Sequence, residues 1–134
     1  MENLHLGNFI HVQKYEKESA GQKVDFFLWL DGHVVCGCVR QKFNPDAPDI
    51  ILPGDTDSIT EQSEIFCRQQ FHIPIFVFVV SGSRWKYVGD YRVEDWTENK
   101  REISLHQKRA ARKVNRTIPI SRILFLEKAP VLEI

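Results

Sequence analysis

The stretch RWKYVGDYRV, residues 84–93, contains residue types that bind flat and negatively charged ligands. If these residues form a β-strand, alternation places four of them on one face: Trp85, Tyr87, Gly89 and Tyr91. Rings in a row beside a glycine leave space where a planar group can stack, and such stacking contributes about 1–3 kcal/mol per base. Trp96 adds a fourth ring just beyond the strand. The alternative is that the rings belong to the core and that the glycine marks a bulge.

Charge is segregated along a chain whose formal net charge is zero. Residues 44–64 contain six carboxylates and no Lys or Arg. Residues 100–116 contain one carboxylate, Glu102, and seven cationic side chains: Lys100, Arg101, Lys108, Arg109, Arg112, Lys113 and Arg116. A neutral protein with this distribution can present a basic face to a polyanion. The alternative is a solvated loop or helix whose cations contact only water.

The cysteines and histidines do not have the spacing of a metal site or a catalytic centre. In HVVCGC, a strand places Cys36 and Cys38 on one face and His33 on the other, so the three cannot converge on zinc. We expect both cysteines to be small core residues. Cys67 and His72 can be written as a nucleophile and a base, but a thiol in the middle of a helix is usually buried and inert. No deaminase, nuclease or phosphate-loop pattern is present, so we expect no enzyme, no metal and no cofactor.

The elements that would position these residues begin with a hairpin. Residues 24–30 and 33–41 are apolar, β-prone runs on either side of Asp31-Gly32, the pair favoured in a two-residue type I′ turn. Residues 9–15 alternate enough to form an earlier strand.

A second hairpin is predicted around the aromatic stretch. Residues 75–80 are an unbroken apolar run, which is typical of a strand buried on both faces. A turn at 81–83 would pair this run with 84–93, and residues 118–127 would form the last strand.

Between these strands the sequence predicts one clear helix. Residues 44–55 hold three prolines and a glycine and should form a loop, after which a helix of about 12 residues begins. Ser58 and Glu61 have the spacing of a capping box. Residues 98–116 are polar and are expected to form a loop with a short helix, or to be flexible without a ligand.

These elements predict an α+β fold that is mainly β, a small twisted antiparallel barrel with one or two packed helices. A length of 134 residues fits a single domain, 1–134. The chain has no apolar run of about 18 residues and no secretory signal, so we expect no membrane partner. The odd count of three cysteines suits a reducing compartment, the cytoplasm or, in a eukaryote, the nucleus.

The stretch Trp85-Lys86-Tyr87-Val88-Gly89-Asp90-Tyr91 resembles the Tyr-x-Tyr-Asp-Gly-x-Tyr motif of the SRA (SET and RING-associated, YDG) domain, a member of the PUA-like group of small barrels. The resemblance covers about residues 73–128, with Val88 standing where the family has Asp. It implies a barrel that recognises DNA carrying a modified cytosine by flipping the base into a pocket with aromatic walls. It also implies a role in modification-dependent restriction, in which a nuclease domain or partner cuts.

The leading hypothesis is therefore a non-catalytic domain that binds nucleic acid, DNA more than RNA, with a modified or flipped base in an aromatic pocket. Three carboxylates could accept hydrogen bonds from a base edge: Asp46, Asp49 and Asp55. Arg84, Lys86 and Arg92 would join residues 100–116 in contacting phosphates. The alternatives are a nucleotide or nucleoside sensor on the same barrel, and a protein-interaction module whose acidic residues 44–64 meet a basic partner.

Overall fold

The computed structural model describes residues 26–79 and 84–130. Within them the chain forms, in order, β1 (Phe26–Leu30), β2 (His33–Arg40), β3 (Ile50–Ile51), α2 (Asp57–Arg68), β4 (Ile73–Val79), β5 (Arg84–Thr97), α3 (Lys100–Val114) and β6 (Ile123–Lys128). The strand expected at residues 9–15 and the turn expected at 81–83 lie outside the described residues.

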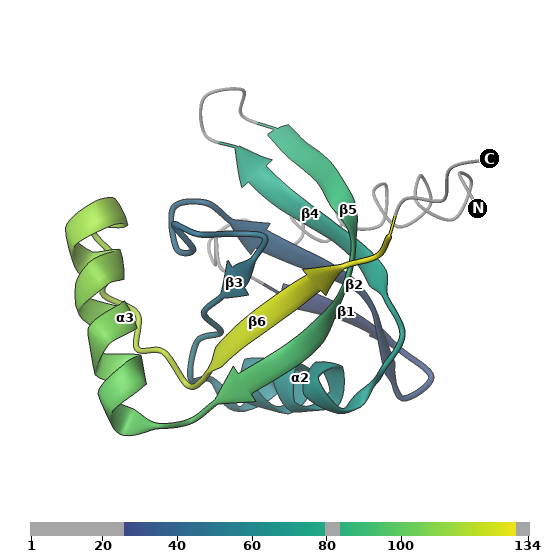
Figure 1. The fold of residues 1–134 in the computed structure, drawn as a ribbon, viewed down its shortest axis with the longest axis horizontal. Helices are drawn as coiled ribbons and strands as arrows, with labels where there is room; N and C mark the ends of the chain where they lie inside the picture. The colour runs from purple at the N-terminus through teal and green to yellow at the C-terminus, as the bar shows by residue number, and fades with distance from the viewer. Residues whose placement is uncertain (1–25, 80–83, 131–134) are drawn as a thin grey trace.

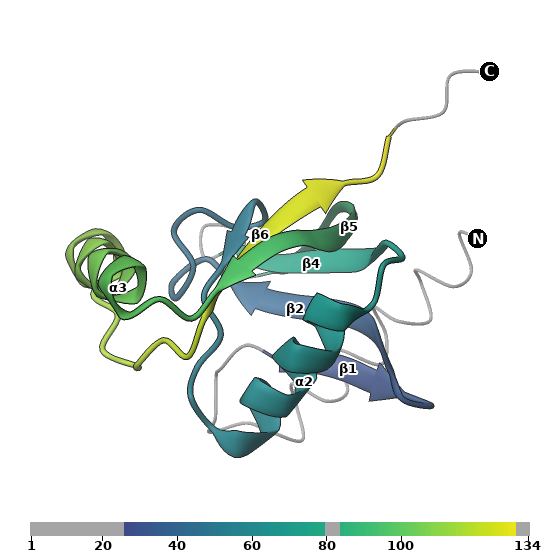
Figure 2. The ribbon, with the colours of Figure 1, turned by 60° about the horizontal axis from the view of Figure 1, so that its bottom comes forward.

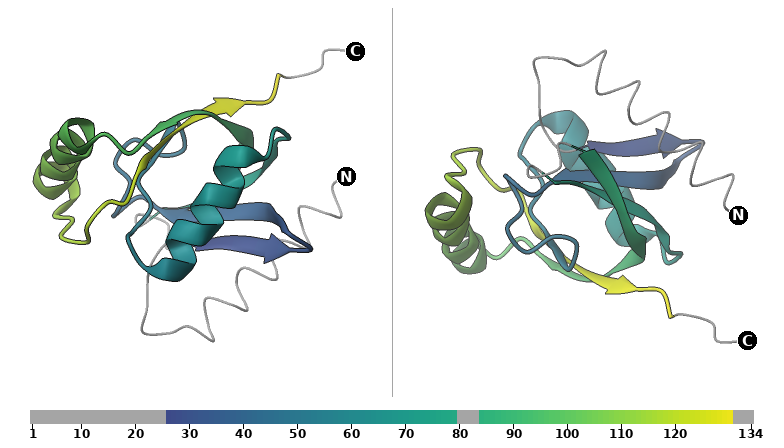
Figure 3. Two further views of the ribbon diagram at one scale, coloured as in Figure 1. Left: turned by 90° about the horizontal axis from the view of Figure 1, so that it is seen from below. Right: turned by 90° about the horizontal axis from the view of Figure 1, so that it is seen from above.

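The six strands form one mixed sheet in the order β1-β2-β4-β5-β6-β3. The sheet curls into a half-barrel, α2 packs against its inner face, and α3 lies at one end of the molecule (Figures 1 and 2). This confirms a mainly β, barrel-like fold, with two helices in the described residues. It differs from the expected antiparallel arrangement in one pair, because β2 and β4 run parallel. Parallel neighbours need a long crossover, and the segment that contains α2 supplies it (Figure 3).

The β1–β2 hairpin has the predicted turn. Asp31 and Gly32 have φ values of 51° and 80°, and a type I′ turn requires positive φ at both central positions. The register shifts by one residue between Leu28 and Trp29, which marks a bulge in this pair. The hairpin prediction is therefore confirmed, with an irregularity that the sequence pattern does not indicate.

Helix α2 has the predicted length of 12 residues, but it is not capped as expected. The N-cap is Thr56, whose hydroxyl accepts a hydrogen bond from the backbone N–H of Ile59 at 3.4 Å. The capping box predicted at Ser58 is therefore wrong, because the helix begins before that residue. At the other end, the Gln69 side chain accepts from the backbone N–H of Val34 at 3.0 Å and donates to its carbonyl at 2.8 Å. This pair of bonds fixes the end of α2 to β2.

The core lies between α2 and the curled sheet. Phe66 of α2 is fully buried, its ring lies 5.4 Å from that of Phe27, and the surrounding cluster contains residues of all six strands. Strand β4 is buried on both faces along its first five residues, as predicted. Cys36 and Cys38 are also fully buried, with Sγ atoms 3.6 Å apart, which confirms that they are small core residues.

The remaining strands differ from prediction in their bounds. β4 begins two residues earlier than expected, and β5 continues to Thr97 instead of ending at Val93. β6 begins at Ile123 instead of residue 118, because Ile120 forms an isolated bridge with Gly54 before the strand starts. The long β5 carries the chain to the end of the half-barrel where α3 begins (Figure 1).

Candidate nucleic-acid interface

The alternation predicted for the aromatic stretch is interrupted by a bulge in β5. Phe76 of β4 pairs with Tyr87, but its neighbour Ile75 pairs with Gly89, so Val88 is an extra residue. Gly89 adopts a φ of +132°, which side chains of L-residues rarely allow. A single extra residue exchanges the two faces of a strand beyond that point. Residues that regular alternation would place on one face therefore lie on opposite faces before and after the bulge, as Trp85 and Tyr91 do.

The four predicted stacking rings do not form one pocket. Trp85 packs edge-on against Phe78 at 5.3 Å and is 6% exposed, whereas Tyr91 is 5% exposed in the core beneath α2. Tyr87 and Trp96 are each 43% exposed. This corrects the single aromatic face. The alternative, with Trp85, Tyr87 and Tyr91 in the core beside a glycine bulge, is confirmed for Trp85 and Tyr91 but is wrong for Tyr87.

A hollow of about 340 Å³ lies beside the bulge. Its lining residues are Tyr87, Val88, Gly89, Asp90, Lys128, Ala129 and Pro130. The Tyr87 hydroxyl donates to Asp90 Oδ1 at 2.7 Å, and burial together with this carboxylate raises the pKa of Tyr87. The hollow thus combines an aromatic ring, a carboxylate acceptor and a cation, which are groups that can hold a small polar ring.

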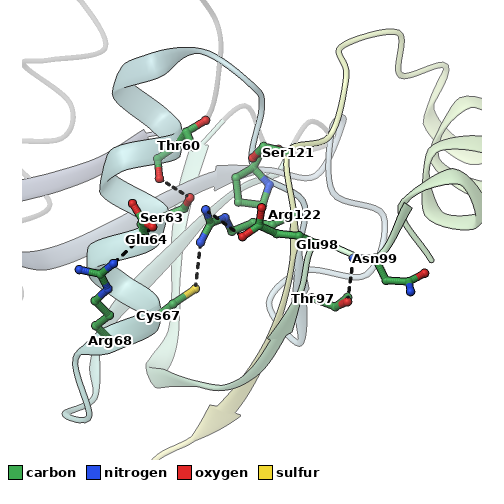
Figure 4. A network of polar contacts seen from close by, with 11 residues as sticks. Thr60, Ser63, Glu64, Cys67, Arg68, Thr97, Glu98, Asn99, Ser121 and Arg122 are labelled. Atoms are coloured by element: carbon green, nitrogen blue, oxygen red, sulfur yellow. Dashed lines mark hydrogen bonds and ion pairs between the residues drawn. The ribbon is translucent and has the colours of Figure 1, made fainter. Parts of the chain in front are cut away.

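Trp96 belongs to a different structural feature, a polar network at the other end of β5. The Arg122 guanidinium stacks on the Trp96 ring at 5.1 Å. It also lies 3.6 Å from Glu98 and donates to Cys67 Sγ at 4.0 Å (Figure 4). Burial raises the pKa of the Cys67 thiol more than Arg122 lowers it. The network therefore ties α2 to the chain beyond β5, while burial favours the protonated form of Cys67.

The three carboxylates predicted at a base edge are not brought together in a pocket. Asp46 accepts two hydrogen bonds from Arg109 of α3, at 3.0 Å from Nε and 2.9 Å from Nη2. The hydrogen bond from Arg109 lowers the pKa of Asp46. Asp49 is exposed near Tyr91, whose pKa is raised by burial and by this carboxylate. Asp55 is exposed just before α2. Asp46 thus serves to dock α3.

Three of the cations predicted at phosphates have protein partners instead. Arg109 holds Asp46, and Arg92 pairs with Glu127 of β6. Arg116 is 4% exposed and donates to three backbone carbonyls: those of Phe43 at 3.1 Å, Leu52 at 2.7 Å and Ile118 at 2.9 Å. A buried guanidinium with such partners cannot reach a ligand, which corrects the prediction for Arg116. The other predicted cations are exposed: Arg84, Lys86, Lys100, Arg101, Lys108, Arg112 and Lys113.

Five of the exposed cations lie on α3, which is a full helix of 15 residues rather than the expected loop with a short helix. The Asn99 side chain caps its N-terminus by accepting from the N–H groups of Arg101 and Glu102 at 3.0 and 3.2 Å. Asn115 ends the helix in the left-handed conformation, with φ of 58°. These two asparagines mark the ends of the helix in the sequence, although the polar composition of the segment between them resembles that of a loop.

One face of α3 is fixed to the body of the protein. The attached residues recur at spacings of four, three and four: Ile103, Gln107, Ala110 and Val114. The three apolar residues pack in a cluster with Leu52, Ile120 and Ile123, and Gln107 exchanges hydrogen bonds with the backbones of Ile118 and Ile120 at 3.1 and 2.9 Å. Together with Arg109 and Arg116, these contacts hold the helix at one end of the half-barrel (Figure 3).

The opposite face of α3 is exposed and basic. Its residues follow the same spacing, two positions earlier: Arg101, Leu105, Lys108 and Arg112. We call this set the outer face of α3. Beside the C-terminal end of the helix lies a groove of about 450 Å³ lined by Gln41, Lys42, Pro45, Lys113 and Val114. Lys42 was not among the predicted site residues, because it is remote from the basic segment in sequence.

Comparisons with known proteins find no match to this chain among family models, curated proteins or solved structures. Within residues 26–79 and 84–130, no three His, Cys, Asp or Glu residues are grouped as metal ligands would be. In the same part of the chain, no helix has both the length and the apolar character needed to cross a membrane.

Proposed function

We propose that this protein is a non-catalytic domain that binds nucleic acid, DNA in preference to RNA, through α3. The observation that carries the proposal is the outer face of α3, where three cations are exposed on a helix whose other face is docked. Phosphate contacts supply most of the affinity of proteins for nucleic acids, and Lys and Arg side chains are the usual donors.

The wider surroundings of α3 support the same proposal. Lys100 lies at the start of the helix, and Lys113 and Lys42 line the groove at its end. Arg109, in contrast, donates to both carboxylate oxygens of Asp46. This carboxylate of the acidic segment 44–64 is therefore paired with Arg109 and not with one of the exposed cations of α3. The exposed cations of α3 are thus left for an external polyanion.

The experiment is a salt titration of DNA binding, read by fluorescence anisotropy of a labelled duplex. Three to five phosphate contacts should weaken binding about 40-fold to 500-fold between 50 and 200 mM salt. The triple variant R101A/K108A/R112A should lower the slope of log K against log salt by about 3.

The matched control is R84A/K86A, which removes two exposed cations from the start of β5. This control should leave the slope within about 1 of the wild-type value. A salt-independent affinity, or a triple variant that binds like the control, contradicts the proposal.

The hollow at the β5 bulge favours a second candidate function, recognition of a nucleobase, either free or flipped from a strand. Tyr87 and Gly89, two of the residues that carry the resemblance to the SRA domain, line it, and Lys128 and Asp90 add a donor and an acceptor. A thermal-shift panel of nucleosides and nucleotides, run on wild type and Y87A, tests this function. Stabilisation of wild type alone supports the base site, and equal shifts in both proteins contradict it.

A further inference from the structure

The outer face of α3 contains one apolar side chain among its cations. Leu105 is 63% exposed, the largest exposed fraction among the large apolar side chains of the described residues. Residues 101, 105, 108 and 112 lie within about 60° of one another around a helix with 3.6 residues per turn. Along the helix Leu105 lies between Arg101 and Lys108, at one edge of the outer face, where an approaching polyanion would contact the helix.

The helix is also accessible along its whole length. α3 lies beside the curled sheet, at the end of the molecule away from both the β1–β2 turn and the end of β6 (Figures 1 and 3). Its apolar contacts with the body come from the face of Ile103, Ala110 and Val114, on the side opposite the outer face. Arg109, which holds Asp46, lies at the margin, about 70° from the centre of the outer face. Glu102, the one carboxylate on α3, follows Arg101 and so lies about 100° from the centre of the outer face.

The dimensions of α3 match one feature of duplex DNA. Fifteen residues give a helix about 22 Å long and about 10–12 Å in diameter. The major groove of B-form DNA is about 12 Å wide and admits an α-helix, with phosphates along both rims and base edges at the floor. A-form RNA has a deep and narrow major groove that side chains cannot read, and a single strand has no groove.

Resting on the proposed function, we propose that α3 enters the major groove of B-form duplex DNA and that Leu105 contacts the base edges. Arg101, Lys108 and Arg112 reach the phosphates on the rims of the groove. An apolar side chain at the floor makes its best contact with the C5-methyl group of thymine. Leu105 is therefore a specificity-determining residue, whereas the surrounding cations give affinity without sequence preference.

The first test compares three ligands of one sequence with the full chain: a B-form DNA duplex, the matching RNA duplex, and the single DNA strand. The expected result is binding to the DNA duplex at least about tenfold tighter than to the other two. Equal or tighter binding to the single DNA strand overturns the major-groove inference and leaves the proposed function standing. Equal or tighter binding to the RNA duplex overturns the major-groove inference and also the preference for DNA, and leaves only nucleic-acid binding through α3. If none of the three binds, the proposed function itself fails.

The second test examines Leu105 directly, by selecting duplexes from a randomised DNA library. L105A should bind the wild-type consensus about fivefold more weakly, lose enrichment of its thymines and keep the wild-type salt slope. The matched control is L30A, which truncates another exposed leucine, at the end of β1 beside the β1–β2 turn. If L105A selects the same sequences as L30A and binds them with the same affinity, the inference is overturned.

Discussion

Arg116 and Arg112 lie four residues apart in the same basic segment, yet the structure gives them opposite roles. Arg116 is buried and donates to three carbonyls from separate parts of the chain, whereas Arg112 faces solvent on α3. The sequence alone does not distinguish them, because both belong to the same basic segment, residues 100–116. Their roles differ because the helix ends at Val114, so that Arg116 follows the turn back into the body.

Replacing Arg116 with alanine should destabilise the protein. Each hydrogen bond to a charged group contributes about 1.5–3 kcal/mol, and the carbonyls left behind are partly buried, so we expect R116A to lower the free energy of unfolding by about 2–4 kcal/mol. Urea denaturation followed by circular dichroism measures this. R112A, an exposed position, should change it by less than about 0.5 kcal/mol. A loss in R116A no larger than that in R112A would show that the three bonds do not stabilise the fold.

Asp46 should make the docking of α3 depend on pH. Arg109 lowers the pKa of Asp46 in the folded protein, whereas an unfolded aspartate titrates near about 3.9. The contribution of the pair is therefore complete above the unfolded value and is lost as the pH falls through the lowered folded value.

The measurement is the melting temperature of wild type and D46N between about pH 6 and pH 2. The two curves should be separated above about pH 4 and should converge at the acidic end. In an R109A background, D46N should have little further effect, because the partner is gone. A constant difference between wild type and D46N over the whole range would contradict this assignment.

At the scale of elements, strand β5 shows what its sequence pattern could and could not predict. The existence of the strand, its pairing with β4 and the presence of rings in the core all follow from its composition. The bulge at Val88 does not, because one extra residue leaves the composition unchanged while it moves Tyr91 to the opposite face from Trp85. Gly89 was the local signal, and it fits a bulge as well as a pocket.

The conformation of Gly89 provides a direct test of the bulge. A Cβ at this position would lie 2.7 Å from Lys128 Cε and 3.3 Å from Tyr91 Cε1, on a backbone with φ of +132°. G89A should therefore lower the free energy of unfolding by about 1–3 kcal/mol.

Two variants separate the causes of this loss. G54A, whose Cβ would meet its nearest neighbour at an ordinary 3.6 Å, should be close to neutral in the same urea experiment. G89A/K128A should stay destabilised, because removing the lysine relieves the contact but not the backbone strain. A neutral G89A would contradict the bulge geometry.

Helix α3 was missed for a different reason. Its composition is polar, so the segment resembles a loop. Its residues nevertheless form two sets with helical spacing, the docked residues and the outer face, which are offset from each other by two positions. Asn99 and Asn115 mark the two ends by capping chemistry that can be read from sequence. The docked stripe is short and interrupted by Gln107, and Gln107 finds its hydrogen-bond partners only when the chain beyond the helix folds back.

At the scale of the whole molecule, the hollow beside Gly89 and the outer face of α3 are separate surfaces, although the sequence predicts that their residues contact one ligand together. The hollow beside Gly89 lies at the far end of β6, whereas α3 lies at the end where β6 begins (Figure 1). The β1–β2 hairpin and the mainly β class follow from local patterns. The parallel pairing of β2 with β4 depends on how α2 packs across the sheet, which no local pattern encodes. The same holds for Asp46 and Arg109, which are 63 residues apart and meet only in the folded chain.

The most direct test of the central claim is a titration of the ¹⁵N-labelled protein with a DNA duplex, followed by NMR of the backbone amides. The account predicts that the largest shifts occur in α3, from Arg101 to Arg112, and at Lys42 in the adjoining groove. Amides of the β1–β2 turn, including Leu30, should not move. Shifts confined to that turn, or no shifts at any DNA concentration at low salt, would contradict the claim that α3 is the nucleic-acid-binding surface.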